Sequence, residues 1–200
     1  GTSLNKQEMR NALYRGRCTN MIYNLSRSYE FLVATGGSIN TARMKDQYII
    51  LRAIAFLMLH RGEFKNIPAL QYRGDIDDFL ARFMMYINDD APEELIVKYE
   101  NLFLQCMSVS YALLGENGFR FSGNGVRRPI NMPLFEALTY LFSFIPKDID
   151  YTWASKLLLD IEDVKDEFDN SRYFSGNIDS TTSVFFRFER MDNIISRVHL

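Results

Sequence analysis

Residues 45–61 read KDQYIILRAIAFLMLHR, and this stretch decides the fold because it holds the longest apolar run of the chain. Between Tyr48 and Leu59 a single charged residue, Arg52, interrupts that run. The run is well short of the roughly 20 residues that cross a bilayer, so we do not expect it to span a membrane. A helix that is apolar on most of its sides is buried by its neighbours. The pattern therefore predicts a central helix over residues 45–61, with other helices around it.

The rest of the chain repeats the helical spacing of apolar residues, which predicts an all-α fold. Such stripes run through residues 76–87, 95–113, 134–145, 153–168 and 184–198. Residues 184–188 also have strand propensity, but the stripe continues to Val198, which is longer than a usual strand. We therefore favour a helix there as well. The predicted architecture is an irregular orthogonal bundle of about seven to nine helices, forming one helical domain over residues 1–200.

The composition supports a packed domain and gives little sign of chemistry. Hydrophobic residues make up 47% of the 200 residues and aromatic residues 14%, which is enough for a core. The net charge of −2 does not indicate nucleic-acid binding, although a local basic patch remains compatible with it. Cys18 and Cys106 match no metal or redox spacing, so we expect no metal site and a reducing cytoplasm. His60 and His199 stand in no known catalytic pattern and are interpreted as structural or solvent-facing.

Residues 1–14, GTSLNKQEMRNALY, form a tight turn that leads directly into a predicted helix. Asn5 is placed to cap this helix, and Glu8 stands at the capping-box spacing. Met9 and Leu13 continue the apolar faces of the following helices, so this helix is expected to pack on the core. A domain rarely begins with a finished turn and helix. We therefore expect the chain to be the later, C-terminal portion of a longer protein.

The same helix carries four long polar side chains close to its start. Two interpretations fit them: a solvated first turn, or contacts with a domain that precedes the chain. The four residues are Gln7, Glu8, Arg10 and Asn11.

Acidic residues cluster in two places. Asp75, Asp77 and Asp78 stand at a helix start, where carboxylates bind a metal or share acid–base work in some proteins. Acids in a first helical turn also complement the helix dipole, and we favour this second interpretation. The acidic run over residues 162–169 is interpreted as a solvated face, which argues against DNA passing along that side.

The loop over residues 117–129 is the strongest candidate for binding. It contains Arg120, Arg127 and Arg128 and no acidic residue. Three glycines in the same loop allow the backbone to approach a phosphate closely. Arginine pairs suit bidentate phosphate contacts. The alternative is a mobile surface loop with scattered positive charge.

Residues 1–12, GTSLNKQEMRNA, resemble the segment G-x-x-L-x-x-Q-E-x-R-N-A of the GmrSD-type restriction-endonuclease N-terminal domain family. In that family a ParB/sulfiredoxin-like nucleotide-binding domain with a D-G-Q-Q-R motif precedes a helical region, and a Gly-Gly turn joins the two. Looser matches follow at Arg43-x-x-Asp46 with residues 49–56, at Phe119-Arg120 with Asn131 and residues 134–138, and at Thr182-Ser183 with Arg187 or Arg190. The D-G-Q-Q-R and H-N-H nuclease motifs of the family are both absent from these 200 residues.

The resemblance implies the helical half of a bacterial or phage-defence protein. The intact form of such a protein binds and hydrolyses a nucleoside triphosphate, and cuts or senses foreign DNA. This chain alone would hold no catalytic residue and no cofactor. It would contact the ParB-like nucleotide-binding domain through Gln7, Glu8, Arg10 and Asn11. It would contact DNA through Arg120, Arg127 and Arg128.

Two other functions remain open. The first is a protein-interaction scaffold without a nucleic-acid role, which the acidic pI and the acidic run favour. The second is a self-contained enzyme with a carboxylate site on Asp75, Asp77 and Asp78.

Overall fold

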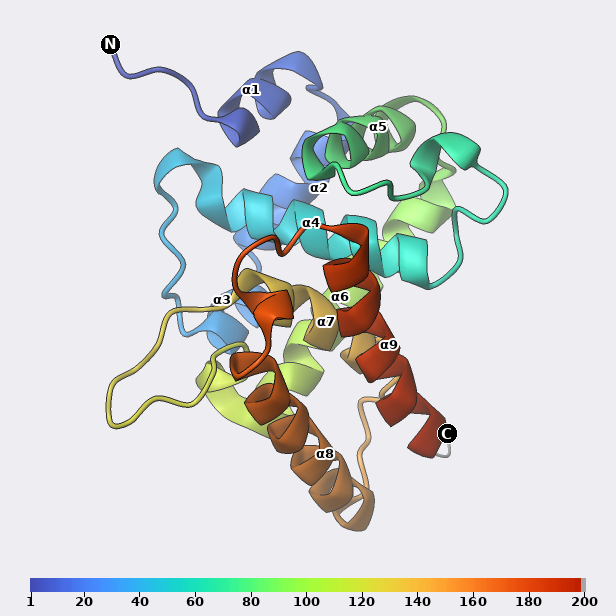
Figure 1. Cartoon of the computed structure of the whole chain (residues 1–200). Helices are drawn as coiled ribbons and strands as arrows, with labels where there is room; N and C mark the ends of the chain where they lie inside the picture. The colour runs from blue at the N-terminus through green and yellow to red at the C-terminus, as the bar shows by residue number, and fades with distance from the viewer. Residues whose placement is uncertain (199–200) are drawn as a thin grey trace.

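The computed structural model of the protein describes residues 1–198, so His199 lies outside the described residues. For Tyr151 it describes the backbone only. Within this range the chain folds into nine α-helices and four short 3-10 helices without any strand (Figure 1). The α-helices are α1 (Lys6–Leu13), α2 (Arg17–Ser26), α3 (Tyr29–Thr35), α4 (Lys45–His60), α5 (Ile76–Asp89), α6 (Glu93–Leu114), α7 (Met132–Phe142), α8 (Tyr151–Asp169) and α9 (Thr181–Arg197). The predicted all-α bundle is confirmed.

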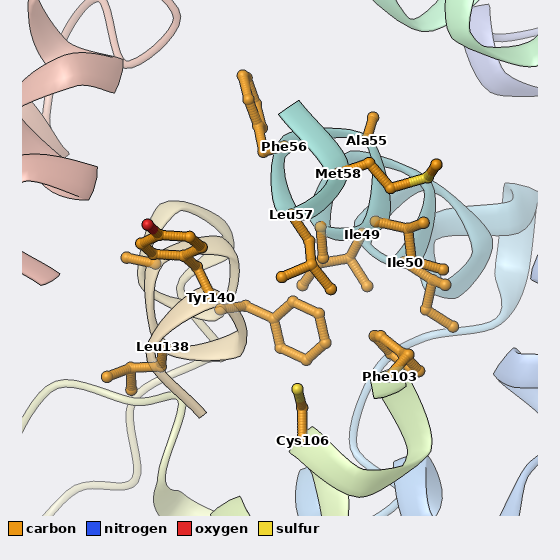
Figure 2. Packing of buried hydrophobic residues seen from close by; sticks show 14 of the residues in the cluster. Ile49, Ile50, Ala55, Phe56, Leu57, Met58, Phe103, Cys106, Leu138 and Tyr140 are labelled. Carbon is orange, nitrogen blue, oxygen red and sulfur yellow. The ribbon is translucent and has the colours of Figure 1, made fainter. Parts of the chain in front are cut away.

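Helices α4 and α7 form the centre of the bundle, as the apolar run predicts for α4. All residues from Ile49 to Met58 are buried, and so are all residues from Pro133 to Phe142. Figure 2 shows Leu57 of α4 close to the side chains of α6, where Phe103 and Cys106 lie. No helix in residues 1–198 is long and apolar enough to cross a membrane.

Side-chain caps set the beginnings of several helices. Asn5 and Glu8 form the predicted capping box of α1, with Oδ1 of Asn5 accepting a 2.8 Å hydrogen bond from the backbone N of Glu8. Asn131 caps α7 in the same way, and Ser180 caps α9. The segment with strand propensity, residues 184–188, is therefore part of a capped helix, as we favoured.

Helix α1 presents its polar face to the protein and its apolar face to solvent, so the expected packing of Met9 and Leu13 on the core is wrong. Met9 is 42% exposed and Leu13 is 74% exposed, whereas Arg10 is only 6% exposed. The reason lies in the partners of Arg10. Its Nη1 lies 2.7 Å from Oδ1 of Asp77 on α5, and its guanidinium carbon lies 5.2 Å from the ring centroid of Tyr48 on α4. An ion pair and a cation–π contact together orient the helix.

Candidate functional site

The loop between α6 and α7 extends from the bundle in Figure 1. Its residues border an open hollow of about 480 Å³. Helix α8 closes the hollow on one side with Glu162 and Lys165. The turn at the tip of the loop needs glycine, because a Cβ on Gly123 would meet the carbonyl oxygen of Val126 at 2.1 Å. Gly125 has a φ of +80°, and its N–H donates a 2.8 Å hydrogen bond to the carbonyl of Gly123. We call this feature the loop hollow.

Arg120 lies at the base of the loop hollow and is 6% exposed. Its guanidinium donates hydrogen bonds to the carbonyl oxygen of Arg128 and to Oγ of Ser38. Its Nε is buried and has no hydrogen-bond partner in the described part of the chain. Burial, and then the neighbouring charge of Arg127, lower the pKa of Arg120. An anion in the hollow would relieve the repulsion between these like charges.

Arg127 and Arg128 stand at the rim, with side chains 45% and 40% exposed. Nη2 of Arg127 lies 3.4 Å from Oε1 of Glu116, and Nη1 of Arg128 pairs with Asp169 of α8. Ion pairs between exposed side chains contribute little free energy, because water screens them. Both rim arginines are therefore able to exchange these partners for a phosphate. The structure brings together all three arginines of the predicted site.

Lys165 of α8 also lines the loop hollow, and no motif in the sequence pointed to it. Its side chain is 7% exposed, and its Nζ lies 3.8 Å from Oε1 of Glu162, which is too long for a hydrogen bond. Burial lowers the pKa of Lys165, and the charges of Glu162 and Asp166 partly oppose that effect. A signal was present in the sequence: Lys165 stands four residues after Ile161 and three before Phe168, on the buried face of α8.

Charge balance in the loop hollow favours an anion. Among the described residues that line it, four are cationic and two, Glu116 and Glu162, are acidic. Glu162, which begins the acidic run of α8, is one of these two acids, and the exposed acids that follow it agree with the interpretation of the run as a solvated face.

The four polar residues of α1 find their partners within the described chain. Gln7 is 4% exposed and accepts a 3.1 Å hydrogen bond from Nε of Arg10. Nδ2 of Asn11 donates to Gln47 at 2.9 Å, and Glu8 pairs with Arg43 at 3.2 Å. Their contact with a preceding domain stays a prediction. The outward face of α1 is instead the apolar one.

The carboxylates at the start of α5 each have a separate partner. Oδ1 of Asp75 caps the helix by accepting from the backbone N of Asp78 at 3.1 Å. Asp77 pairs with Arg10 at 2.7 Å, and Asp78 pairs with Arg82 at 3.0 Å. Among residues 1–198 no group of three or more His, Cys, Asp or Glu side chains is placed to hold a metal ion. Asp75 at the N-cap and Asp77 and Asp78 in the first turn of α5 agree with the helix-dipole interpretation of the cluster.

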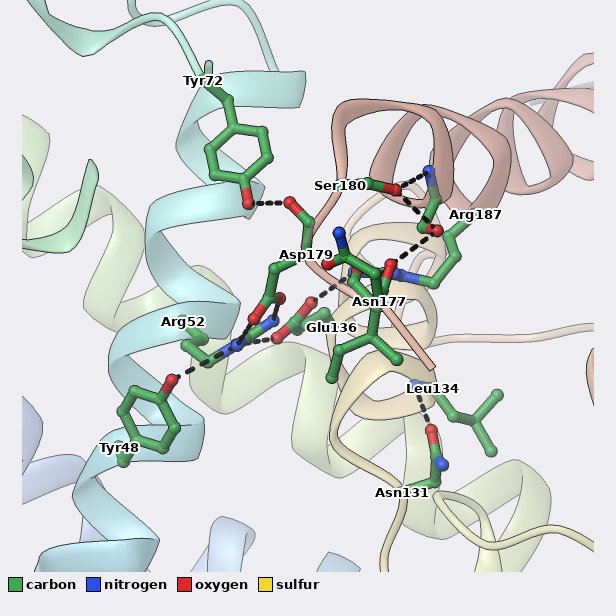
Figure 3. Close-up of polar contacts among 12 residues, drawn as sticks. Tyr48, Arg52, Tyr72, Asn131, Leu134, Glu136, Asn177, Asp179, Ser180 and Arg187 are labelled. Carbon is green, nitrogen blue, oxygen red and sulfur yellow. Dashed lines mark hydrogen bonds and ion pairs between the residues drawn. The ribbon is translucent and has the colours of Figure 1, made fainter. Parts of the chain in front are cut away.

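A buried charge network joins α4, α7 and α9 (Figure 3). Glu136 of α7 accepts hydrogen bonds from Arg52 of α4 and Arg187 of α9, and all three side chains are at most 1% exposed. Nη2 of Arg52 also lies 2.7 Å from Oδ1 of Asp179, whose backbone carbonyl accepts a hydrogen bond from the hydroxyl of Tyr72. Two positive and two negative charges balance here, out of reach of a substrate. We therefore assign the network to the stability of the fold.

The three side chains come from segments that lie far apart in the sequence. Arg52, Glu136 and Arg187 meet in one contact, so these segments share a structural role in the core.

His60 is half-buried and stacks on the core residue Phe188, which agrees with its structural interpretation. Its ring lies 3.7 Å from that of Phe188 at an angle of 9°, and its Nε2 has no hydrogen-bond partner among the described residues. Burial, and then the charge of Arg187, lower the pKa of His60 to about 3.

The comparisons with known proteins do not assign the chain to a family. It matches no family model, no curated protein and no solved structure.

Proposed function

We propose that the chain is a non-catalytic helical module of a GmrSD-like, nucleotide-dependent DNA restriction protein, and that the loop hollow contacts DNA phosphates. The observation that carries this proposal is the convergence of Arg120, Arg127, Arg128 and Lys165 on one hollow. Arginine side chains suit phosphate because their planar fork donates two parallel hydrogen bonds. The module would work in the cytoplasm of a cell that defends itself against foreign DNA.

The outward face of α1 supports the proposed contact with a nucleotide-binding domain that precedes the chain. Leu4 is 60% exposed, and Met9 and Leu13 extend the apolar surface along the helix. Apolar surface that is exposed in a contiguous group is typical of a protein interface. Nucleoside triphosphate would bind in that preceding domain. Glu8 and Asn11 lie at the edge of the face, where they are partly exposed.

The test of DNA contact is the salt dependence of binding to a labelled duplex with 5′-hydroxyl ends, measured by fluorescence anisotropy. The logarithm of the association constant falls with the logarithm of salt concentration by about 0.9 for each phosphate contacted. Replacing both rim arginines, Arg127→Ala with Arg128→Ala, is expected to reduce that slope by about 2.

Arg15→Ala is the matched control for the duplex experiment. Arg15 is exposed, and it belongs to the segment between α1 and α2, which lies away from the α6–α7 loop in Figure 1. This variant is expected to keep the slope of the unaltered protein. Binding that the double variant leaves unchanged would refute the assignment of the loop hollow.

The second candidate function is a protein-interaction scaffold, which the exposed apolar face of α1 favours. A hydrophobic protein interface responds little to salt, whereas phosphate contacts weaken steeply. The same salt series therefore separates the two functions, provided that a protein partner is titrated in parallel. Substituting Met9→Ser with Leu13→Ser would weaken the scaffold interaction and leave DNA binding unchanged.

A further inference from the structure

We propose that the loop hollow takes a phosphomonoester, the terminal phosphate of a nucleotide or of a nucleic-acid strand, with Arg120 and Lys165 as its inner donors. This inference rests on the proposed function, which places phosphate contacts in the loop hollow. It adds that the phosphate entering the hollow is a terminal one. The shared chemistry is a phosphate group with three free oxygens, carrying about −1.5 to −2 charges at pH 7.

The depth of the donors is the first argument. Arg120 is 6% exposed and the Lys165 side chain is 7% exposed, whereas the rim arginines are 40–45% exposed. An internal phosphate of a duplex is held on both sides by the strand, so it reaches the rim and not the base. A terminal phosphate protrudes from its strand and is able to enter the hollow.

Unfilled hydrogen-bonding capacity at the base is the second argument. Nη1 and Nη2 of Arg120 each carry two N–H groups, and each has one acceptor among the described residues. Nζ of Lys165 carries three donors, and its distance of 3.8 Å to Glu162 is too long for a hydrogen bond. Both groups therefore keep N–H donors that are able to bind a further acceptor. A dianionic phosphate supplies acceptors for both groups at once.

The acidic surface beside the hollow is the third argument. Glu162 and Asp166 are exposed on α8 at the level of Lys165, and Asp169 follows at its end. Duplex DNA carries one negative charge for roughly every 1.7 Å of its axis, so a duplex lying across α8 would meet repulsion. A single terminal group that enters the hollow avoids most of that repulsion.

The size of the hollow agrees with a small ligand. Its volume of about 480 Å³ lies within the range of roughly 300–1,000 Å³ that is typical of small-molecule sites. One nucleotide fits in such a space, and a double helix does not.

The experiment compares ligands that differ only by the terminal phosphate, using isothermal titration calorimetry on the 200-residue chain. Deoxyadenosine 5′-monophosphate is expected to bind at least tenfold more tightly than deoxyadenosine. A short single strand with a 5′-phosphate is compared with the same strand ending in a 5′-hydroxyl. A preference for the phosphorylated strand identifies strand ends as the source of the phosphate, and binding of the mononucleotide alone identifies free nucleotides.

The inner donors are tested by Lys165→Met, which keeps the apolar stem of the side chain and removes its charge. This variant is expected to weaken phosphomonoester binding at least tenfold, and Lys165→Arg is expected to restore part of it. Lys156→Met is the matched control, because Lys156 is exposed on the same helix. Circular dichroism and the melting temperature establish that each variant is folded.

Equal binding of the phosphorylated and unphosphorylated ligands would overturn the inference, and so would a Lys165→Met variant that binds like the unaltered protein. The duplex with 5′-hydroxyl ends tests the proposed function separately. If that duplex fails to bind while the mononucleotide binds through Lys165, the inference stands and DNA contact fails. If the duplex binds through Arg127 and Arg128 alone, the proposed function stands and the inference fails.

Discussion

Acidification from pH 7.5 to pH 5 is expected to destabilise the fold through His60. Its ring is stacked on Phe188 in the core, and burial, followed by the charge of Arg187, lowers its pKa to about 3. In the unfolded chain the pKa returns to about 6.5. Between these two values the unfolded state binds a proton that the folded state does not, so stability falls as the pH falls. Above the unfolded pKa this histidine contributes no pH dependence.

The magnitude follows from the shift. One pKa unit corresponds to about 1.4 kcal/mol. His60 alone should therefore lower the free energy of unfolding by about 2 kcal/mol at pH 5 and by about 3 kcal/mol at pH 4. His60→Phe should remove this contribution while keeping a ring on Phe188. Because Nε2 of His60 has no partner among the described residues, the substitution leaves no broken hydrogen bond on that atom.

The assay is urea unfolding of both proteins at pH 7.5 and pH 5, followed by circular dichroism. Carboxylates and His199 are present in both proteins, so their titration cancels in the difference between the two pH dependences. The unaltered protein is expected to lose about 2 kcal/mol more than His60→Phe between these pH values. A difference below about 0.5 kcal/mol would refute the neutral state of His60 in the folded protein.

Three further predictions concern the core and the absence of catalysis. Glu136→Gln should lower the free energy of unfolding in urea by about 3–5 kcal/mol, because the positive charges of Arg52 and Arg187 stay buried without the carboxylate that balances them. The same change at the exposed Glu94 should have little effect. Similar losses at both positions would contradict the role of the network. Cys18 and Cys106 are fully buried, which raises the pKa of both thiols, so a thiol reagent should label them only as fast as the protein unfolds; rapid labelling of the folded protein would disprove this. The purified chain should hydrolyse neither nucleoside triphosphates nor DNA in the presence of Mg²⁺, and metal-dependent nuclease activity in clean protein would exclude the non-catalytic assignment.

The central part of the fold was predictable because its signal is local. The apolar run of residues 45–61 requires burial on all sides, whichever helices provide it. The capping box of Asn5 and Glu8 depends on a spacing of three residues, and it formed as predicted.

The orientation of α1 was not predictable from its own sequence. Met9 and Leu13 suggested the buried face, but Asp77 lies 67 residues away from Arg10 along the chain and attracts it inward. An ion pair between distant segments produces no periodic pattern in the sequence of either segment. The spacing of apolar residues alone therefore predicted the wrong buried face.

The candidate site was predictable in part. Arg120, Arg127 and Arg128 share one short loop, so their proximity follows from the chain itself. Lys165 joins them only because α8 packs beside that loop, and its place in an acidic run concealed it. The burial of Arg120 was likewise not predictable, because it depends on hydrogen bonds to Ser38, which is 82 residues away, and to the carbonyl of Arg128.

The network around Arg52 has a consequence for biosynthesis. Arg52 pairs with Asp179, which leaves the ribosome 127 residues later. At a synthesis rate of roughly 5–20 residues per second, the nascent helix α4 waits about 6–25 s for this last partner. Until α7 and then α9 emerge, the apolar sides of α4 that these helices later cover are exposed. A nascent chain of this protein is thus a natural client for chaperones that hold exposed hydrophobic helices near the ribosome.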